Sequence, residues 1–402
     1  MPGKLQGKNI LFYGLIREGG FADAIAREMT KQGARVLCLA APELDDKGEQ
    51  SLQDKKIEVI RTPIWYGLKD DEFPEDFRNL KKPTDILAYQ PDVAACKTAF
   101  DQSNKKALSE ATQVFAEVHK RTAGKLHGII HIMAGGLPRT RGMMVLTKCM
   151  LGTDDPNKFI STEAFSESPV FQHIVSPNID LVTAISYQHI FTAGAELLAA
   201  NPGCPVVALG YQGEHVQNID ENWEFSSYPG YLVGYAKNLL QDMAKTQRQQ
   251  GHHAVVVNLM GAETASTNAF SGIEYYIFNS LRQLQASGKF SLEMVLSECQ
   301  DRLLPEFTPN DVVEKADEYL FSPAIQKTLD QPFPVHSTLE ILQMTLQVEK
   351  QIVAMHKNRK SLVTTPVSNY VKGLMARCFW PEVVECQEPQ TLLDTKRIIE
   401  RS

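Results

Sequence analysis

The sequence of 402 residues lacks three features that would assign it to a specialised class of protein. It has no excess of basic residues, since 41 Lys and Arg stand against 48 Asp and Glu, and a general nucleic-acid binder needs clustered cations. It contains no run of about 18 apolar residues, so neither a membrane-spanning helix nor a membrane partner is expected. Its first residues contain no apolar segment followed by a small-residue cleavage site, so no secretory signal is predicted.

Cysteine pairs at regular spacing are also missing. The seven cysteines are scattered, odd in number and without CxxC spacing. This pattern argues against a disulfide framework and against a structural zinc site, so no metal is expected. Reduced thiols in a cytoplasmic protein are the simplest interpretation. The composition, 43% hydrophobic and 22% charged, is that of an ordinary globular protein.

Short apolar runs alternate with stretches of helical periodicity. The apolar runs, which predict strands, lie at 9–13, 35–39, 57–60, 128–133, 206–209 and 254–258. Helical patterns at 103–121, 180–200 and 230–250 lie between them. This alternation predicts an α/β fold, a Rossmann-like doubly wound parallel sheet with helices on both faces. After residue 337, two neighbouring apolar stripes predict a helix that packs on the body of the protein or on a second subunit.

A glycine turn from Gly14 to Ala22 joins the first strand to the first helix. Glycines allow a tight turn, and they let backbone N–H groups approach a pyrophosphate at the helix N-terminus. The spacing is not GxGxxG, so dinucleotide binding and a purely structural turn are both open interpretations. No acidic residue ends the second strand to hold a ribose diol, because Cys38-Leu-Ala-Ala-Pro42 stands there, which leaves NADH and NADPH equally open.

Several landmarks, in order along the chain, resemble one family. The first landmark is the glycine turn, in which five residues separate Gly14 from Gly20-Phe-Ala22. The others are Asp92-Val93, His131-Ile-Met-Ala134-Gly135-Gly136, Leu209-Gly-Tyr211-Gln-Gly213, Gly234-Tyr-Ala236-Lys237 and the segment 258–267. Together they resemble the divergent short-chain dehydrogenases/reductases that act as enoyl-acyl carrier protein reductases. The resemblance implies a Rossmann-type domain over 1–337 with insertions at about 63–104 and 137–178. The helical C-terminal extension over 338–402 has no counterpart in that resemblance.

The resemblance also implies a cofactor site for NADH or NADPH and a tyrosine–lysine pair. The implied cofactor-binding residues are Gly14, Ile16, Gly20, Phe21, Asp92, Val93, Ala134, Gly135, Lys237, Thr264 and Thr267. Lys237 is the firmest catalytic candidate. In the family, six residues separate the tyrosine from the lysine, and at that spacing this chain has Gly230. Tyr231 is therefore the preferred catalytic tyrosine, Tyr228 is the alternative, and Tyr211 is expected to face the acyl group.

These residues would support hydride transfer to the β-carbon of an enoyl thioester, with the Tyr and Lys stabilising the enolate. Two alternatives stay open. A β-ketoacyl reductase would need Tyr at the position of Val233, and a cofactor-binding pseudoenzyme is compatible with the displaced tyrosine. The sequence does not choose between acyl carrier protein and coenzyme A as carrier, or between fatty-acid and polyketide synthesis. Because the family assembles through sheet-flanking helices, a homo-oligomer is expected.

Overall fold

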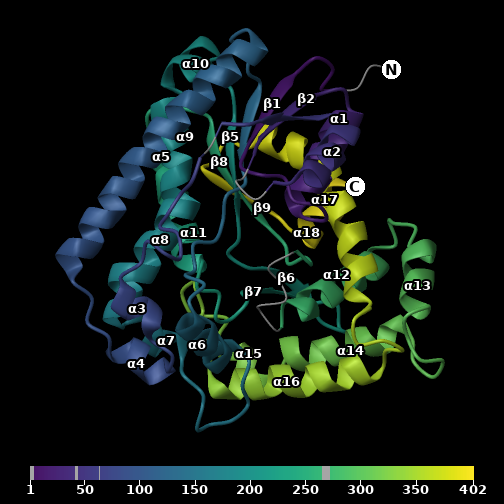
Figure 1. Cartoon of the computed structure of the whole chain (residues 1–402). Helices are drawn as coiled ribbons and strands as arrows, with labels where there is room; N and C mark the ends of the chain where they lie inside the picture. The colour runs from purple at the N-terminus through teal and green to yellow at the C-terminus, as the bar shows by residue number, and fades with distance from the viewer. Residues whose placement is uncertain (1–3, 41–43, 63, 265–271) are drawn as a thin grey trace.

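The computed structural model describes residues 4–40, 44–62, 64–264 and 272–402. Seven parallel strands form one sheet in the order β3-β2-β1-β4-β5-β8-β9 (Figure 1). The strands are β1 (Asn9–Tyr13), β2 (Arg35–Leu39), β3 (Ile57–Ile60), β4 (Gly128–His131), β5 (Val206–Gly210), β8 (Ala254–Leu259) and β9 (Gln390–Leu393). The Rossmann-like parallel sheet and all six predicted strands are thereby confirmed.

Both faces of the sheet are covered, which explains why the strands read as continuous apolar runs. Along β1, Ile10 and Phe12 enter one core, whereas Leu11 and Tyr13 enter the core on the opposite face. The first face is covered by α1 (Phe21–Lys31), α12 (Ile273–Ser287) and α17 (Thr364–Glu385). The second face is covered by α5 (Val93–Thr122), α9 (Ser186–Ala193) and α11 (Gly234–Gln249).

A two-stranded antiparallel hairpin, which the sequence did not predict, follows β5. It consists of β6 (Glu214–Gln217) and β7 (Trp223–Ser226), and β6 packs against α12. The other elements of the main body are α2 (Asp46–Asp54), α10 (Ala195–Ala200), α13 (Glu293–Gln300), α14 (Pro309–Leu320) and α15 (Pro323–Gln326). The hairpin places its first residue beside the end of β8, where it contributes to the site described below.

The two insertions pack on each other. The first carries α3 (Glu75–Asn79) and α4 (Pro83–Ala88), and the second carries α6 (Arg141–Leu151), α7 (Thr162–Ser166), the π-helical η1 (Phe171–Val175) and α8 (Ser176–Asp180). They share an apolar cluster with the start of α11. The Asn178 side chain joins their ends, because its Nδ2 donates to Gly136 O at 2.7 Å and its Oδ1 accepts from the Leu68 N–H at 2.6 Å. Gly136 follows β4, so the second insertion begins at the carboxyl edge of the sheet.

The segment after residue 337 is mainly helical and returns to the sheet. Its first helix, α16 (Leu339–Ala354), packs on α14 and α15, so the apolar face predicted there contacts the body of the same chain. Helix α17 then packs on α1 and α12, β9 pairs with β8, and α18 (Thr395–Arg401) ends the chain. The strand β9 was missed by the sequence analysis. Its four residues depend on pairing with β8 rather than on a local pattern of their own.

Candidate active site

The glycine turn after β1 has the geometry of an anion site. Gly14 has a φ of +139°, and a Cβ atom there would lie 2.7 Å from Ile132 Cγ1, so the position favours glycine. Gly20 caps α1 without a side chain, which leaves the first-turn N–H groups uncapped by their own cap residue. Such N–H groups favour a negatively charged ligand. Ile16 is buried beside this turn, and Phe21 is the first helical residue.

The loop after β4 forms the neighbouring part of the same edge. Ala134 is exposed, and Gly135 has a φ of +129°, which again favours glycine. The Gly135 N–H donates to Thr183 Oγ1 at 3.3 Å. Thr183 belongs to η2 (Leu181–Ile185), a π-helical turn within a longer helix. Turns of this kind are frequent at functional sites, but the sequence pattern over 180–200 showed only ordinary helical periodicity.

Lys237 lies on the first turn of α11 with its ammonium at the end of β5. The side chain is 4% exposed, and Nζ donates to Leu209 O at 2.7 Å. Burial lowers the pKa of Lys237 to about 8. An ammonium has three N–H donors, so this bond leaves capacity for a ligand hydroxyl. Burial, with a smaller contribution from the Lys237 charge, lowers the pKa of His131 to about 3, so this core histidine is neutral.

The three candidate tyrosines lie together beside Lys237's helix, but they have different surroundings. The rings of Tyr211 and Tyr231 meet edge to face at 5.5 Å between centroids. The Tyr211 hydroxyl accepts a hydrogen bond from the Tyr228 N–H at 3.2 Å, so it is directed at backbone. Tyr228 is packed in the core that contains α12 and α14. Tyr231 is half-buried in the turn that begins α11, and burial raises its pKa to about 12, which keeps the hydroxyl protonated at neutral pH.

Asp92 and Val93 do not reach this edge, and this prediction is corrected. Asp92 caps α5 by accepting the Ala95 N–H at 3.0 Å, and Val93 is 50% exposed. The helix enters the core beside the sheet only from Ala107 onwards, about 22 Å further along its axis. Figure 1 shows the start of α5 at the opposite side of the molecule from α1. The first insertion separates Asp92 from β3, and the residues directly after β3 are Arg61 and Thr62.

The segment after β8 forms the remaining wall. Glu214 of the hairpin is buried, and its Oε1 accepts from the Gly261 N–H at 2.6 Å. Burial raises the pKa of Glu214 to about 8. Asn258 Oδ1 is buried beside Gly210 and has no hydrogen-bond partner among the described residues. Such an orphaned acceptor at the carboxyl edge fits a ligand with N–H donors. Thr264 ends the described part of this segment, and Thr267 lies outside the described residues.

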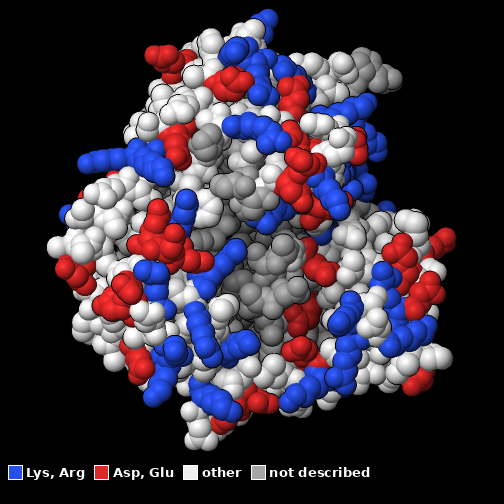
Figure 2. Space-filling model, in the orientation of Figure 1, with Lys and Arg blue, Asp and Glu red and all other residues white. Residues whose placement is uncertain are grey.

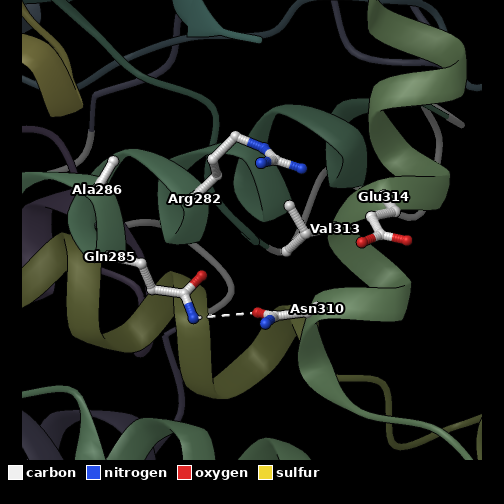
Figure 3. Close-up of a pocket in the computed structure, with 6 residues that line it drawn as sticks. All are labelled: Arg282, Gln285, Ala286, Asn310, Val313 and Glu314. Atoms are coloured by element: carbon white, nitrogen blue, oxygen red, sulfur yellow. Dashed lines mark hydrogen bonds between the residues drawn. The ribbon is translucent and has the colours of Figure 1, made fainter. Parts of the chain in front are cut away.

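A separate cavity of about 280 Å³ lies between α12 and α14 (Figure 3). It is lined by Arg282, Gln285, Ala286, Asn310, Val313 and Glu314. Two of its polar side chains have partners, since Gln285 donates to Asn310 at 3.1 Å and Arg282 pairs with Asp317 at 2.5 Å. No strand contributes to its lining. The strand ends beside Lys237 therefore form the better candidate for catalysis.

A family model for the enoyl-acyl carrier protein reductase FabMG matches residues 49–401. The chain belongs to the FabMG family of enoyl-acyl carrier protein reductases. The resemblance stated from the sequence is therefore confirmed, and so is the expected enoyl reductase activity. The match to the FabMG family includes the C-terminal segment after residue 337, but it begins after the glycine turn.

Two solved structures with FabMG in their titles are similar to this chain over nearly its whole length. An apo structure of FabMG has a TM-score of 0.88 at 21% identity, and the match covers 98% of this chain and 94% of the FabMG chain. An NADH-bound structure of FabMG has a TM-score of 0.75 at 19% identity, with 97% and 94% covered. At these identities the likeness concerns the fold. No curated protein matches the sequence.

Proposed function

We propose that NADH lies across the carboxyl edge of the sheet, with its diphosphate at the turn from Gly14 to Phe21 and its nicotinamide ribose held by Lys237. The observation that carries this proposal is the buried Lys237 ammonium at the end of β5. The turn after β1 and the orphaned Asn258 Oδ1 at the end of β8 support the same placement. NADH is preferred over NADPH because the similar FabMG structure was obtained with NADH.

The bound dihydronicotinamide would supply a hydride to the β-carbon of the enoyl group. Negative charge then develops on the thioester oxygen, and preorganised donors aimed at that oxygen lower the barrier. Tyr231 is the proposed donor, because its hydroxyl is protonated at neutral pH and its turn leads directly into the helix of Lys237. Lys237 orients the ribose, and its positive charge favours the enolate.

The test is the loss of NADH absorbance with crotonyl-acyl carrier protein. Turnover of this substrate, without turnover of a β-ketoacyl thioester, is the result that the proposed function requires. Oxidation of NADH with the β-ketoacyl substrate alone would assign a ketoreductase. Saturable NADH binding without any turnover would assign a cofactor-binding pseudoenzyme.

The exposed face of α6 supports a protein-linked substrate. Arg141, Met144, Val145 and Lys148 are exposed and lie on one face of this helix, with Met144 54% and Val145 37% exposed. Figure 2 shows Lys and Arg side chains gathered over the region of α6, below the centre of the view. A basic rim around apolar side chains fits an acidic protein surface. We therefore propose that an acyl carrier protein, rather than coenzyme A, presents the enoyl group.

Charge reversal on α6 is expected to change KM for the substrate on acyl carrier protein but not KM for the substrate on coenzyme A. The variant Arg141→Glu/Lys148→Glu should raise KM for crotonyl-acyl carrier protein by about tenfold at low salt, because attraction becomes repulsion. KM for crotonyl-coenzyme A should stay within twofold. The control Arg359→Glu/Lys360→Glu makes the same charge change on exposed residues of the turn after α16. Equal effects of the α6 variant on both substrates would remove the support for carrier-protein docking there.

The activity of the enzyme should fall at alkaline pH. A lysine is charged below its pKa, and burial lowers the pKa of Lys237 to about 8, so its ammonium is lost as the pH rises through this value. Log kcat/KM is therefore expected to decline above about pH 8, since this parameter follows groups of the free enzyme. In Lys237→Arg, whose guanidinium does not deprotonate, any residual activity should lack that decline. A flat wild-type profile to pH 10 would contradict this assignment.

We also propose that the protein is a homo-oligomer in the cytoplasm. All seven cysteines are free, which fits a compartment that keeps thiols reduced. The described residues include no helix that is long and apolar enough to span a bilayer. Helix α5 runs along the rim of the molecule in Figure 1, and it is the sheet-flanking helix proposed to contact a second copy. Light scattering on the purified protein would measure the mass of the assembly directly.

A further inference from the structure

Helix α17 of the C-terminal segment reaches the cofactor edge through two side chains one turn apart. Ser368 Oγ accepts from the Glu263 N–H at 2.8 Å, and Lys372 Nζ donates to Glu263 O at 3.0 Å. The Lys372 ammonium also donates to Gly19 O. Residues four apart lie on one face of a helix, so a single face of α17 binds both the backbone N–H and the backbone C=O of Glu263. It thereby joins the segment after β8 to the glycine turn after β1.

The charge of Lys372 is poorly compensated in the protein. The side chain is 4% exposed, and no salt bridge joins it to a carboxylate in the described part of the chain. Burial lowers the pKa of Lys372, although the carboxylates of Glu263 and Asp23 raise it from a distance and Arg27 lowers it further. A buried ammonium held by neutral carbonyls keeps much of its desolvation penalty. An arriving anion would offset that penalty.

The position of Lys372 indicates which anion this is. Gly19 directly precedes Gly20, the cap of α1, where the diphosphate is proposed to bind. The Gly19 N–H donates to the buried carboxylate of Asp23 at 3.1 Å. Asp23 is itself paired with Arg27 and Lys55, at 3.2 Å in each case. Lys372, on the carbonyl of the same glycine, adds the positive charge that a dianionic ligand needs.

We propose that Lys372 is a positioning residue of the dinucleotide site, which balances the diphosphate and, with Ser368, holds Glu263 against the glycine turn. This inference rests on the proposed function. It gives the C-terminal segment after residue 337, which lies outside the Rossmann-type domain implied by the sequence resemblance, a direct part in cofactor binding. It also explains why α17 packs so closely on α1, the helix whose N-terminus faces the diphosphate.

The experiment compares Lys372→Met with Ser368→Ala by titration with NADH, ADP-ribose and adenosine. Lys372→Met should weaken NADH and ADP-ribose at least tenfold and leave the affinity for adenosine, which has no phosphate, unchanged. Ser368→Ala loosens Glu263 but keeps the charge, so it should weaken ADP-ribose less than threefold. The rise in melting temperature that NADH causes should shrink in Lys372→Met, because the stabilisation by a ligand grows with the logarithm of its concentration divided by Kd, so a weaker ligand stabilises the folded state less.

The possible outcomes separate this inference from the proposed function. Failure of the wild-type protein to bind NADH would overturn both. Binding of NADH to wild type and to Lys372→Met with equal affinity would overturn the inference alone. Equal weakening of ADP-ribose and adenosine by Lys372→Met would also overturn it, since that pattern belongs to a structural contact without a role for charge. If Lys372→Met does not fold, Lys372→Gln, which keeps an N–H donor without the charge, takes its place.

Discussion

Lys237→Ala is expected to lower kcat/KM for crotonyl-acyl carrier protein by about a thousandfold or more. The substitution removes both the proposed ribose contact and the positive charge beside the developing enolate, and one such donor alone is worth about a hundred- to a thousandfold. Steady-state kinetics with NADH measure the loss. NADH titration of the variant should also show weaker binding, because the ribose contact is made before the chemical step.

The matched control for this variant is Lys245→Ala, an exposed lysine on the same helix. It should have wild-type kinetics. Loss of folding is not expected from Lys237→Ala, since burial lowers the pKa of Lys237 to about 8 and its charged form therefore destabilises the fold below that pH. Far-ultraviolet circular dichroism checks this point. Wild-type rates in Lys237→Ala would refute the site assignment.

Tyr231→Phe is expected to lower kcat by about a hundred- to a thousandfold, with little change in the affinity for NADH. Only the hydroxyl is removed, so the loss corresponds to about 3 kcal/mol of transition-state stabilisation from one oxyanion donor. The edge-to-face contact of the ring with Tyr211 should survive. Single-turnover kinetics would place the loss in the hydride-transfer step.

The control for this prediction is Tyr228→Phe. Tyr228 is 3% exposed and packed in the core with α12 and α14, so its replacement should change kcat by less than fivefold. A larger loss in Tyr228→Phe than in Tyr231→Phe would transfer the catalytic role to Tyr228. The spacing between tyrosine and lysine would then be eight residues rather than five.

The fold followed from the sequence because its determinants are local. The six predicted strands of the central sheet are buried on both faces, so each reads as a short apolar run whatever its neighbours are. The strand β9 carries no such run, and its structure comes from pairing with β8, which is distant in the sequence. The β6–β7 hairpin was missed for a similar reason, since its burial pattern is set by contacts with α12 and the end of β8.

The candidate site was predictable only in part. Gly14 and Gly135 take backbone angles that favour glycine, and such positions leave a visible signal in a sequence. Asp92 and Val93 matched a motif by residue type, but the insertion before them moves them away from the end of β3. Lys372 and Glu214 gave no local signal at all. Their roles arise from long-range contacts, and Lys372 reaches a carbonyl that is 353 residues away in the chain.

Titration of the folded wild-type protein with NADH tests the central claim most directly. If the dinucleotide occupies the edge formed by the glycine turn, Lys237 and the segment after β8, protein fluorescence should change to saturation with one site per chain, and Lys237→Ala should bind more weakly. Absence of saturable binding of both NADH and NADPH to protein with native circular dichroism would contradict the account.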